Sequence, residues 1–111
     1  MVDETIISGV RHYLSNLEKQ GIAVRMGVIF GSRVHGTFNL WSDIDLVVVS
    51  PVFDGEYSRE MVSKLWRTAA RTDSRIEPIP CGERQWREDA GSPILEIARG
   101  EGIIVNSEKA I

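Results

Sequence analysis

The sequence predicts an α/β or α+β domain, and three observations point to that fold class. Two stretches carry apolar residues at helical spacing. Short runs rich in β-branched residues lie between and after those stretches, which indicates strands. The length of 111 residues is ordinary for one domain, so residues 1–111 are expected to fold as a single unit.

The first third of the chain predicts a helix, a strand and a loop. In residues 6–17 the apolar side chains recur at helical spacing, and a glycine follows at the position of a helix stop. Residues 22–30 are rich in β-branched and aromatic residues, which predicts a buried strand that ends at Gly31 and Ser32. The polar residues 33–42 predict a short helix or turn followed by a loop.

The middle third predicts a second strand and a second long helix. Ile44–Val49 is aliphatic except for Asp45 and is closed by Ser50-Pro51, as expected of a buried strand. Residues 53–55 are expected to turn the chain. In residues 57–71 an apolar stripe lies opposite basic side chains, which is typical of an amphipathic helix.

The last third predicts two short strands around a short helix. Residues 75–79 are expected to form a strand that ends at Pro80, and Pro78 favours an edge position or a strand end. Residues 93–99 predict a helix stopped by Gly100, and residues 102–105 predict a final strand.

Composition favours a folded protein that does not bind nucleic acid strongly and does not cross a membrane. The content of 42% hydrophobic and 26% charged residues is ordinary for a globular domain, and the net charge of -3 disfavours general binding to nucleic acid. The longest purely aliphatic run, residues 46–49, is too short to cross a membrane. Cys81 is the single cysteine, so no internal disulfide forms. With an acidic start that lacks a secretory-signal pattern, these features predict a cytoplasmic protein.

Two aspartates stand at the mouth of the strand predicted for Ile44–Val49. Because alternate side chains of a strand point to the same face, Asp43 and Asp45 are expected to converge on one spot. Two like charges this close repel each other, and a magnesium ion would relieve the repulsion while taking carboxylate oxygens as ligands. The pair therefore indicates a magnesium site, although an Asp-x-Asp pattern alone also fits a solvated strand entry.

Gly31 and Ser32 end the preceding strand and are expected to open a short helix. Glycine lets a phosphate approach the backbone closely, and the amides at a helix start suit an anion. The Ser32 hydroxyl adds one donor, whereas Arg33 is equally suited to a phosphate or to a surface carboxylate. A phosphate cradle at one strand end and a metal site at the next would together hold a metal–triphosphate.

This segment resembles the signature of the DNA polymerase beta-like nucleotidyltransferase superfamily: Gly31-Ser32, ten further residues, and then Asp43-Ile44-Asp45. The surrounding Gly-Ser-Arg-x-x-Gly and Ser-Asp-Ile-Asp-Leu are especially similar to its minimal branch, called MNT. The resemblance implies the fold of that superfamily, a small mixed sheet flanked by helices.

The resemblance also implies a third acidic residue on a later strand. Glu77 occupies that place instead of the commoner aspartate, with Asp73 and Glu83 as nearby alternatives. The family resemblance assigns two magnesium ions to Asp43, Asp45 and Glu77. It assigns the triphosphate to Gly31 and Ser32, with Arg33 as a further contact.

The function implied by the resemblance is transfer of a nucleoside monophosphate, expected as AMP from ATP, to a hydroxyl acceptor. In the MNT branch the expected partner is an HEPN-family toxin, so this chain would be the antitoxin and the acceptor a hydroxyl of the toxin, such as a tyrosine. Two alternatives stay open: a binding module that neutralises its partner by covering it, and an antibiotic-type small-molecule nucleotidyltransferase acting as a dimer. An oligomer is therefore compatible with the sequence.

Overall fold

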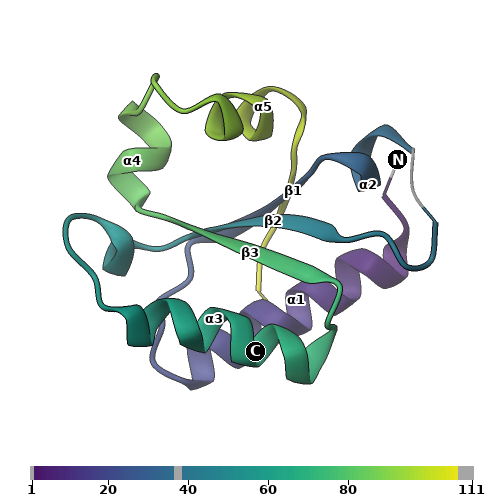
Figure 1. The fold of residues 1–111 in the computed structure, drawn as a ribbon, viewed down its shortest axis with the longest axis horizontal. Helices are drawn as coiled ribbons and strands as arrows, with labels where there is room; N and C mark the ends of the chain where they lie inside the picture. Colours follow the sequence, from purple (N-terminus) through teal and green to yellow (C-terminus); the bar gives the residue numbers. More distant parts are fainter. Residues whose placement is uncertain (1, 37–38, 108–111) are drawn as a thin grey trace.

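A four-stranded mixed sheet with helices on both faces forms the framework of the computed structural model, which describes residues 2–36 and 39–107 (Figure 1). The strand order across the sheet is β3-β2-β1-β4. The elements in chain order are α1 (Glu4–Lys19), β1 (Met26–Phe30), α2 (Ser32–His35), β2 (Ile44–Val49), the 3₁₀ helix η1 (Pro51–Phe53), α3 (Arg59–Thr72), β3 (Ile76–Cys81), α4 (Glu83–Glu88), α5 (Pro93–Glu101) and β4 (Ile103–Val105). The expected fold class, a small mixed sheet flanked by helices, is confirmed.

The strand pairing brings three chain segments to one end of the sheet. β1 runs antiparallel to β2 and to β4, whereas β2 and β3 are parallel and are joined by the crossover helix α3. Asp45 is the register partner of Phe30 in β1 and of Glu77 in β3. The end of β1 and the starts of β2 and β3 therefore lie side by side.

The two faces of the sheet support two separate apolar cores. Helices α1 and α3 cover one face, and α4 and α5 lie over the other (Figure 1). Along β2, Leu46 and Val48 belong to the core under α1 and α3, while Val47 and Val49 belong to the other core. Because side chains of a strand alternate between faces, a strand buried on both sides must be aliphatic without interruption.

Local caps and one buried hydrogen bond fix the helices on the sheet. Asp3 caps α1 by accepting from the Thr5 amide, and Ser58 and Ser92 cap α3 and α5. The buried Tyr13 hydroxyl of α1 donates to a carbonyl oxygen of α3 at 2.9 Å, which ties the two helices together. Within the described residues, no helix has the length and apolar character needed to cross a membrane.

Several predicted boundaries are wrong, and each error has a physical cause. β1 begins at Met26 and not at residue 22, because Met26 pairs with Val49, the last residue of β2. α3 begins at Arg59, since Ser58 serves as its cap. The Gly100 stop is also wrong because α5 continues to Glu101, and Gly102 follows as its cap. In the loop predicted within residues 33–42, residues 37 and 38 lie outside the described residues.

The predicted end of β3 at Pro80 is wrong, whereas the edge position indicated by Pro78 is confirmed. The flanking carbonyls of Arg75 and Cys81 accept hydrogen bonds from the amides of Ile44 in β2 and of Ser50 directly after it. Alternate residues of a strand direct their backbone groups to opposite sides, so Pro78 and Pro80 direct theirs to the open edge. No ladder hydrogen bond is lost there, and the strand passes through both prolines.

Candidate active site

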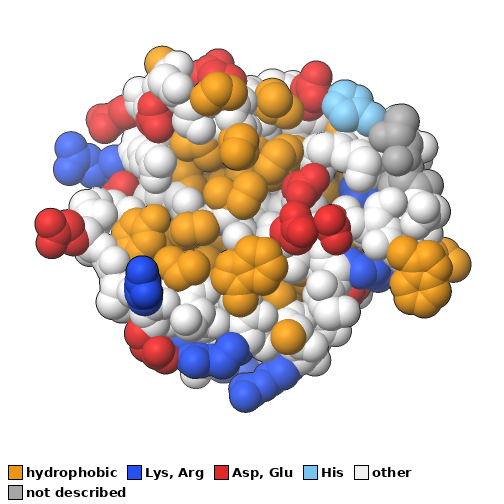
Figure 2. All heavy atoms as spheres, viewed as in Figure 1, with side chains coloured by type: hydrophobic (Ala, Val, Ile, Leu, Met, Phe, Trp, Pro, Cys, Tyr) orange, Lys and Arg blue, Asp and Glu red, His pale blue; other side chains and the backbone are white. Residues whose placement is uncertain are grey.

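Three carboxylates from two neighbouring strands meet at this end of the sheet. Asp43 directly precedes β2, Asp45 is its second residue, and Glu77 is the second residue of β3. The parallel register pairs Asp45 with Glu77, and the Glu77 carboxyl is in hydrogen-bonding contact with both aspartates. Figure 2 shows acidic side chains gathered near the centre of this face, beside an apolar area. The structure thus brings together the three acidic residues that the sequence singles out.

The environment of these carboxylates disfavours their charge. Partial burial raises the pKa of Asp45, and the neighbouring charge of Asp43 raises it further, while the contact with Glu77 lowers it. The pKa of Glu77 is raised by burial and by both aspartates. The cluster carries a repulsion that a cation would relieve.

Gly31 occupies a position that only glycine fits. Its φ of 77° lies in the left-handed region, which side chains other than glycine rarely adopt. A Cβ atom at Gly31 would also collide with the Asp45 carboxylate, so the turn into α2 passes directly against the acidic cluster. The Gly31 carbonyl accepts from the amides of Val34 and His35, which closes the first turn of α2. Gly31 therefore adjoins Asp45, and Ser32 follows it as the first residue of α2.

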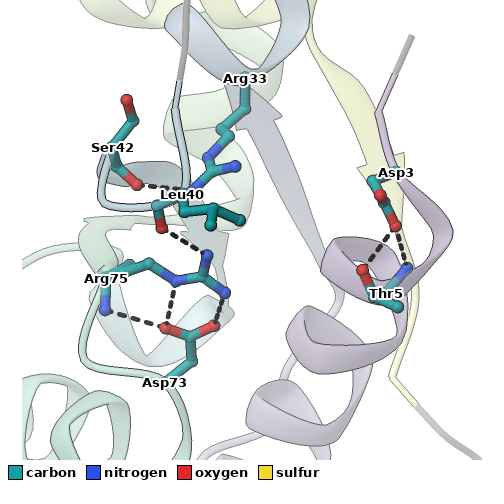
Figure 3. Close-up of polar contacts among 7 residues, drawn as sticks. All are labelled: Asp3, Thr5, Arg33, Leu40, Ser42, Asp73 and Arg75. Atoms are coloured by element: carbon teal, nitrogen blue, oxygen red, sulfur yellow. Dashed lines mark hydrogen bonds and ion pairs between the residues drawn. The ribbon is translucent and has the colours of Figure 1, made fainter.

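Arg33 follows Ser32 in α2, but its side chain turns into the protein. The residue is only 3% exposed, and Nη2 donates to the carbonyl oxygen of Ser42 at 2.8 Å (Figure 3). This contact anchors the backbone directly before Asp43. A contact between Arg33 and a phosphate remains a prediction.

The two other candidates for the third carboxylate are held elsewhere. Asp73 accepts a bidentate pair of hydrogen bonds from Arg75, and Glu83 pairs with Arg25 at 2.9 Å. Among the described residues, no group of three or more histidine, cysteine or acidic side chains is arranged so that it could hold a metal ion by itself. The structure therefore offers adjoining oxygen donors at Asp43, Asp45 and Glu77, not a complete ligand set.

The contact from Arg75 to the Leu40 carbonyl is a feature of this site that the sequence does not indicate. It joins residues 35 positions apart, and no local pattern connects them. This hydrogen bond could be expected only after the parallel pairing of β2 and β3 is known, because that pairing brings Arg75 close to residues 40–44.

A mixed sheet that carries adjoining carboxylates on two strands, with a Gly-Ser turn beside them, is the arrangement expected of a nucleotidyltransferase domain. The family model for the nucleotidyltransferase domain matches residues 7–92, and the chain belongs to this family. The match includes both aspartates, Glu77 and the Gly-Ser turn, and it ends before α5. No curated protein matches the chain.

Solved structures with a similar fold include two toxin–antitoxin proteins. One was determined with AMP-PNP and has a TM-score of 0.57 and 20% sequence identity over 87% of this chain and 73% of that chain. A mutant of the toxin–antitoxin pair MntA–HpeT has a TM-score of 0.54 and 17% sequence identity, over 86% of this chain and 71% of that chain. A protein from Sulfolobus solfataricus assigned as a nucleotidyltransferase has a TM-score of 0.56 and 16% sequence identity, over 88% of this chain and 77% of that chain. At these identities the likeness shows the fold.

Proposed function

We propose that the protein is a magnesium-dependent nucleotidyltransferase that transfers AMP from ATP to a hydroxyl group of an acceptor. The observation that carries the proposal is the meeting of Asp43, Asp45 and Glu77 beside Gly31 in a chain of the nucleotidyltransferase family. Carboxylate oxygens are the donors that magnesium prefers, and the pKa values of Asp45 and Glu77 are raised by burial and by the neighbouring carboxylates. The chemistry of these side chains suits magnesium, and in this proposal the bound nucleotide supplies the further ligands.

In this proposal, different side chains bind the metal, bind the phosphates and accept the proton. Bound magnesium would neutralise the triphosphate and stabilise the charge that develops on it. Asp43 and Asp45 would hold the metal at the start of β2, and Gly31 and Ser32 would bind the β- and γ-phosphates at the start of α2. Glu77 would hold the metal from β3 and take up the proton of the attacking hydroxyl. The new bond joins the acceptor oxygen to the α-phosphorus, the bond to the β-phosphate oxygen breaks, and pyrophosphate leaves.

We further propose that the acceptor belongs to a partner protein of the HEPN family and that this chain is the antitoxin in the cytoplasm. Two solved structures of similar fold are toxin–antitoxin proteins, and one of them was determined with an ATP analogue. In this proposal, residues 1–111 are a catalytic unit, and the partner supplies the hydroxyl to be modified.

The alternative function is a binding module that neutralises a partner without chemistry. Exposed apolar side chains favour it: Trp66 is 49% exposed on α3, and Ile94 and Ile97 are exposed on α5. Figure 2 shows apolar side chains beside the acidic cluster, so a partner could cover both together.

Calorimetric titration of an ATP analogue, with and without magnesium, separates the two functions. We expect magnesium-dependent binding to the wild type and none to the Asp43→Asn/Asp45→Asn double variant. Binding that survives in the double variant would contradict the proposed site. No binding by the wild type, alone or mixed with its partner, would support the binding module instead. Label transfer from ATP to the partner then tests the chemistry.

A further inference from the structure

The backbone around Asp43 is anchored from both sides by two arginines. Arg75 donates from Nη1 to the Leu40 carbonyl at 2.9 Å, and Arg33 donates from Nη2 to the Ser42 carbonyl at 2.8 Å (Figure 3). The Ile44 amide in turn donates to the backbone carbonyl of Arg75 at 2.8 Å. Residues 40, 42 and 44 are therefore all tied down, and Asp43 lies between the last two.

Asp73 fixes the orientation of the Arg75 side chain. Nε and Nη2 of Arg75 donate to the two oxygens of Asp73 at 2.9 and 2.6 Å, and the Arg75 amide donates to the same carboxylate at 3.0 Å. This fork occupies one edge of the guanidinium and leaves Nη1 directed at Leu40, as Figure 3 shows. Both side chains are partly buried, at 30% and 21% exposed, so the fork is only partly open to solvent.

Arg75 also lies two residues before Glu77, directly ahead of β3. The residue contacts residues 40–44 at two points, through its side chain at Leu40 and through its backbone at Ile44. These two hydrogen bonds fix the position of the segment that carries Asp43 relative to the strand that carries Glu77. A displacement of residues 40–44 would move Asp43 relative to the other two carboxylates.

We infer that Arg75, locked by Asp73, is a positioning residue that holds Asp43 in register with Glu77 for binding of a divalent cation. The inference rests on the proposed function, since it concerns the same carboxylates. A segment that is already ordered loses little conformational freedom when a cation binds, so the braced protein binds more tightly than an unbraced one. Arg33 anchors the same segment from α2.

Manganese binding in the absence of nucleotide tests this inference, with the wild type, Arg75→Ala, Asp73→Asn and the conservative Arg75→Lys compared by calorimetry. We expect Arg75→Ala to weaken manganese binding by about tenfold, the lower end of the usual effect for groups that support metal ligands. Asp73→Asn should have a smaller effect in the same direction. Arg75→Lys should recover part of the affinity, because lysine keeps the charge but not the fork.

The matched control is Arg67→Ala, which removes an arginine of α3 whose ion pair with Glu60 is exposed. Amide hydrogen exchange of residues 40–44 in the metal-free protein should accelerate in Arg75→Ala and stay unchanged in Arg67→Ala. Equal manganese affinity in Arg75→Ala and Arg67→Ala would overturn the positioning role alone. If the wild type itself bound no manganese, the proposed metal site would fail, and the inference would fail with it.

Discussion

Strand β2 and the residue before it contain two contrasting regions. One is the aliphatic part from Leu46 to Val49, and the other is an acidic start formed by Asp45 and by Asp43, which directly precedes the strand. The aliphatic part is fully buried and contributes alternate side chains to the two cores. The acidic start gathers like charges, and the pKa of Asp45 is raised by burial and by Asp43. A strand anchored on both faces can therefore keep charged groups together at its end although they repel one another. The site depends on stability supplied by its neighbours in the same strand.

The largest effect is expected from the aliphatic part. Leu46→Ala should lower the free energy of unfolding by about 2–5 kcal/mol, because it leaves a cavity in the core under α1 and α3. Urea denaturation measures this loss. The matched control is Leu40→Ala, since Leu40 is 76% exposed and its loss should change stability by less than about 0.5 kcal/mol. Equal effects of the two substitutions would show that Leu46 does not anchor the strand.

The next effect concerns the site itself. Glu77→Gln should reduce the turnover of AMP transfer by about 100-fold, the usual scale for loss of a group that moves a proton in the rate-limiting step. Affinity for an ATP analogue should change much less, because the phosphates are bound mainly from α2. Turnover by label transfer and affinity by calorimetry are measured separately. Glu83→Gln is the control, and a larger loss of turnover there would identify Glu83 as the third carboxylate.

A smaller effect concerns the pH dependence of stability, which distinguishes Asp73 from the acidic cluster. Hydrogen bonds from Arg75, together with the nearby charge of Arg33, hold the pKa of the Asp73 carboxyl below its usual value. A lowered folded-state pKa gives stability that is present above the unfolded pKa and is lost as pH falls through the folded pKa. Asp73→Asn should therefore cost about 1 kcal/mol at pH 7 and almost nothing at the acidic end, measured by urea denaturation. A cost that is independent of pH would contradict the ionic contact.

Sequence patterns predict the parts of this structure that are determined locally. Periodicity indicates α1 and α3, and the aliphatic run indicates β2. Helix α4 is not predicted, because its start is capped by Asp54, which accepts from the amides of Arg84 and Gln85 about 30 residues away. The course of β3 through two prolines likewise depends on its edge position, which only the completed sheet determines.

The same division holds within the candidate site. Asp43, Asp45, Gly31 and Ser32 occur close together in the sequence, so the pattern alone identifies them. Glu77 joins them only through the parallel register of β2 and β3, and its selection over Asp73 and Glu83 reflects the ion pairs of those two residues. The buried orientation of Arg33 toward Ser42 is likewise a tertiary feature.

The central claim is that the acidic start of β2 destabilises the metal-free protein and is stabilised by a bound cation. Its most direct test is the melting temperature of the wild type and of Asp45→Asn, each measured with EDTA and with magnesium at neutral pH. Because the folded-state pKa of Asp45 is raised, its ionisation costs stability as pH rises above the unfolded-state pKa, and the cost is complete above the folded-state pKa. We predict that Asp45→Asn melts above the wild type in EDTA, and that magnesium raises the melting temperature of the wild type only. A variant that melts below the wild type in EDTA, or an equal rise with magnesium in both proteins, would contradict the account.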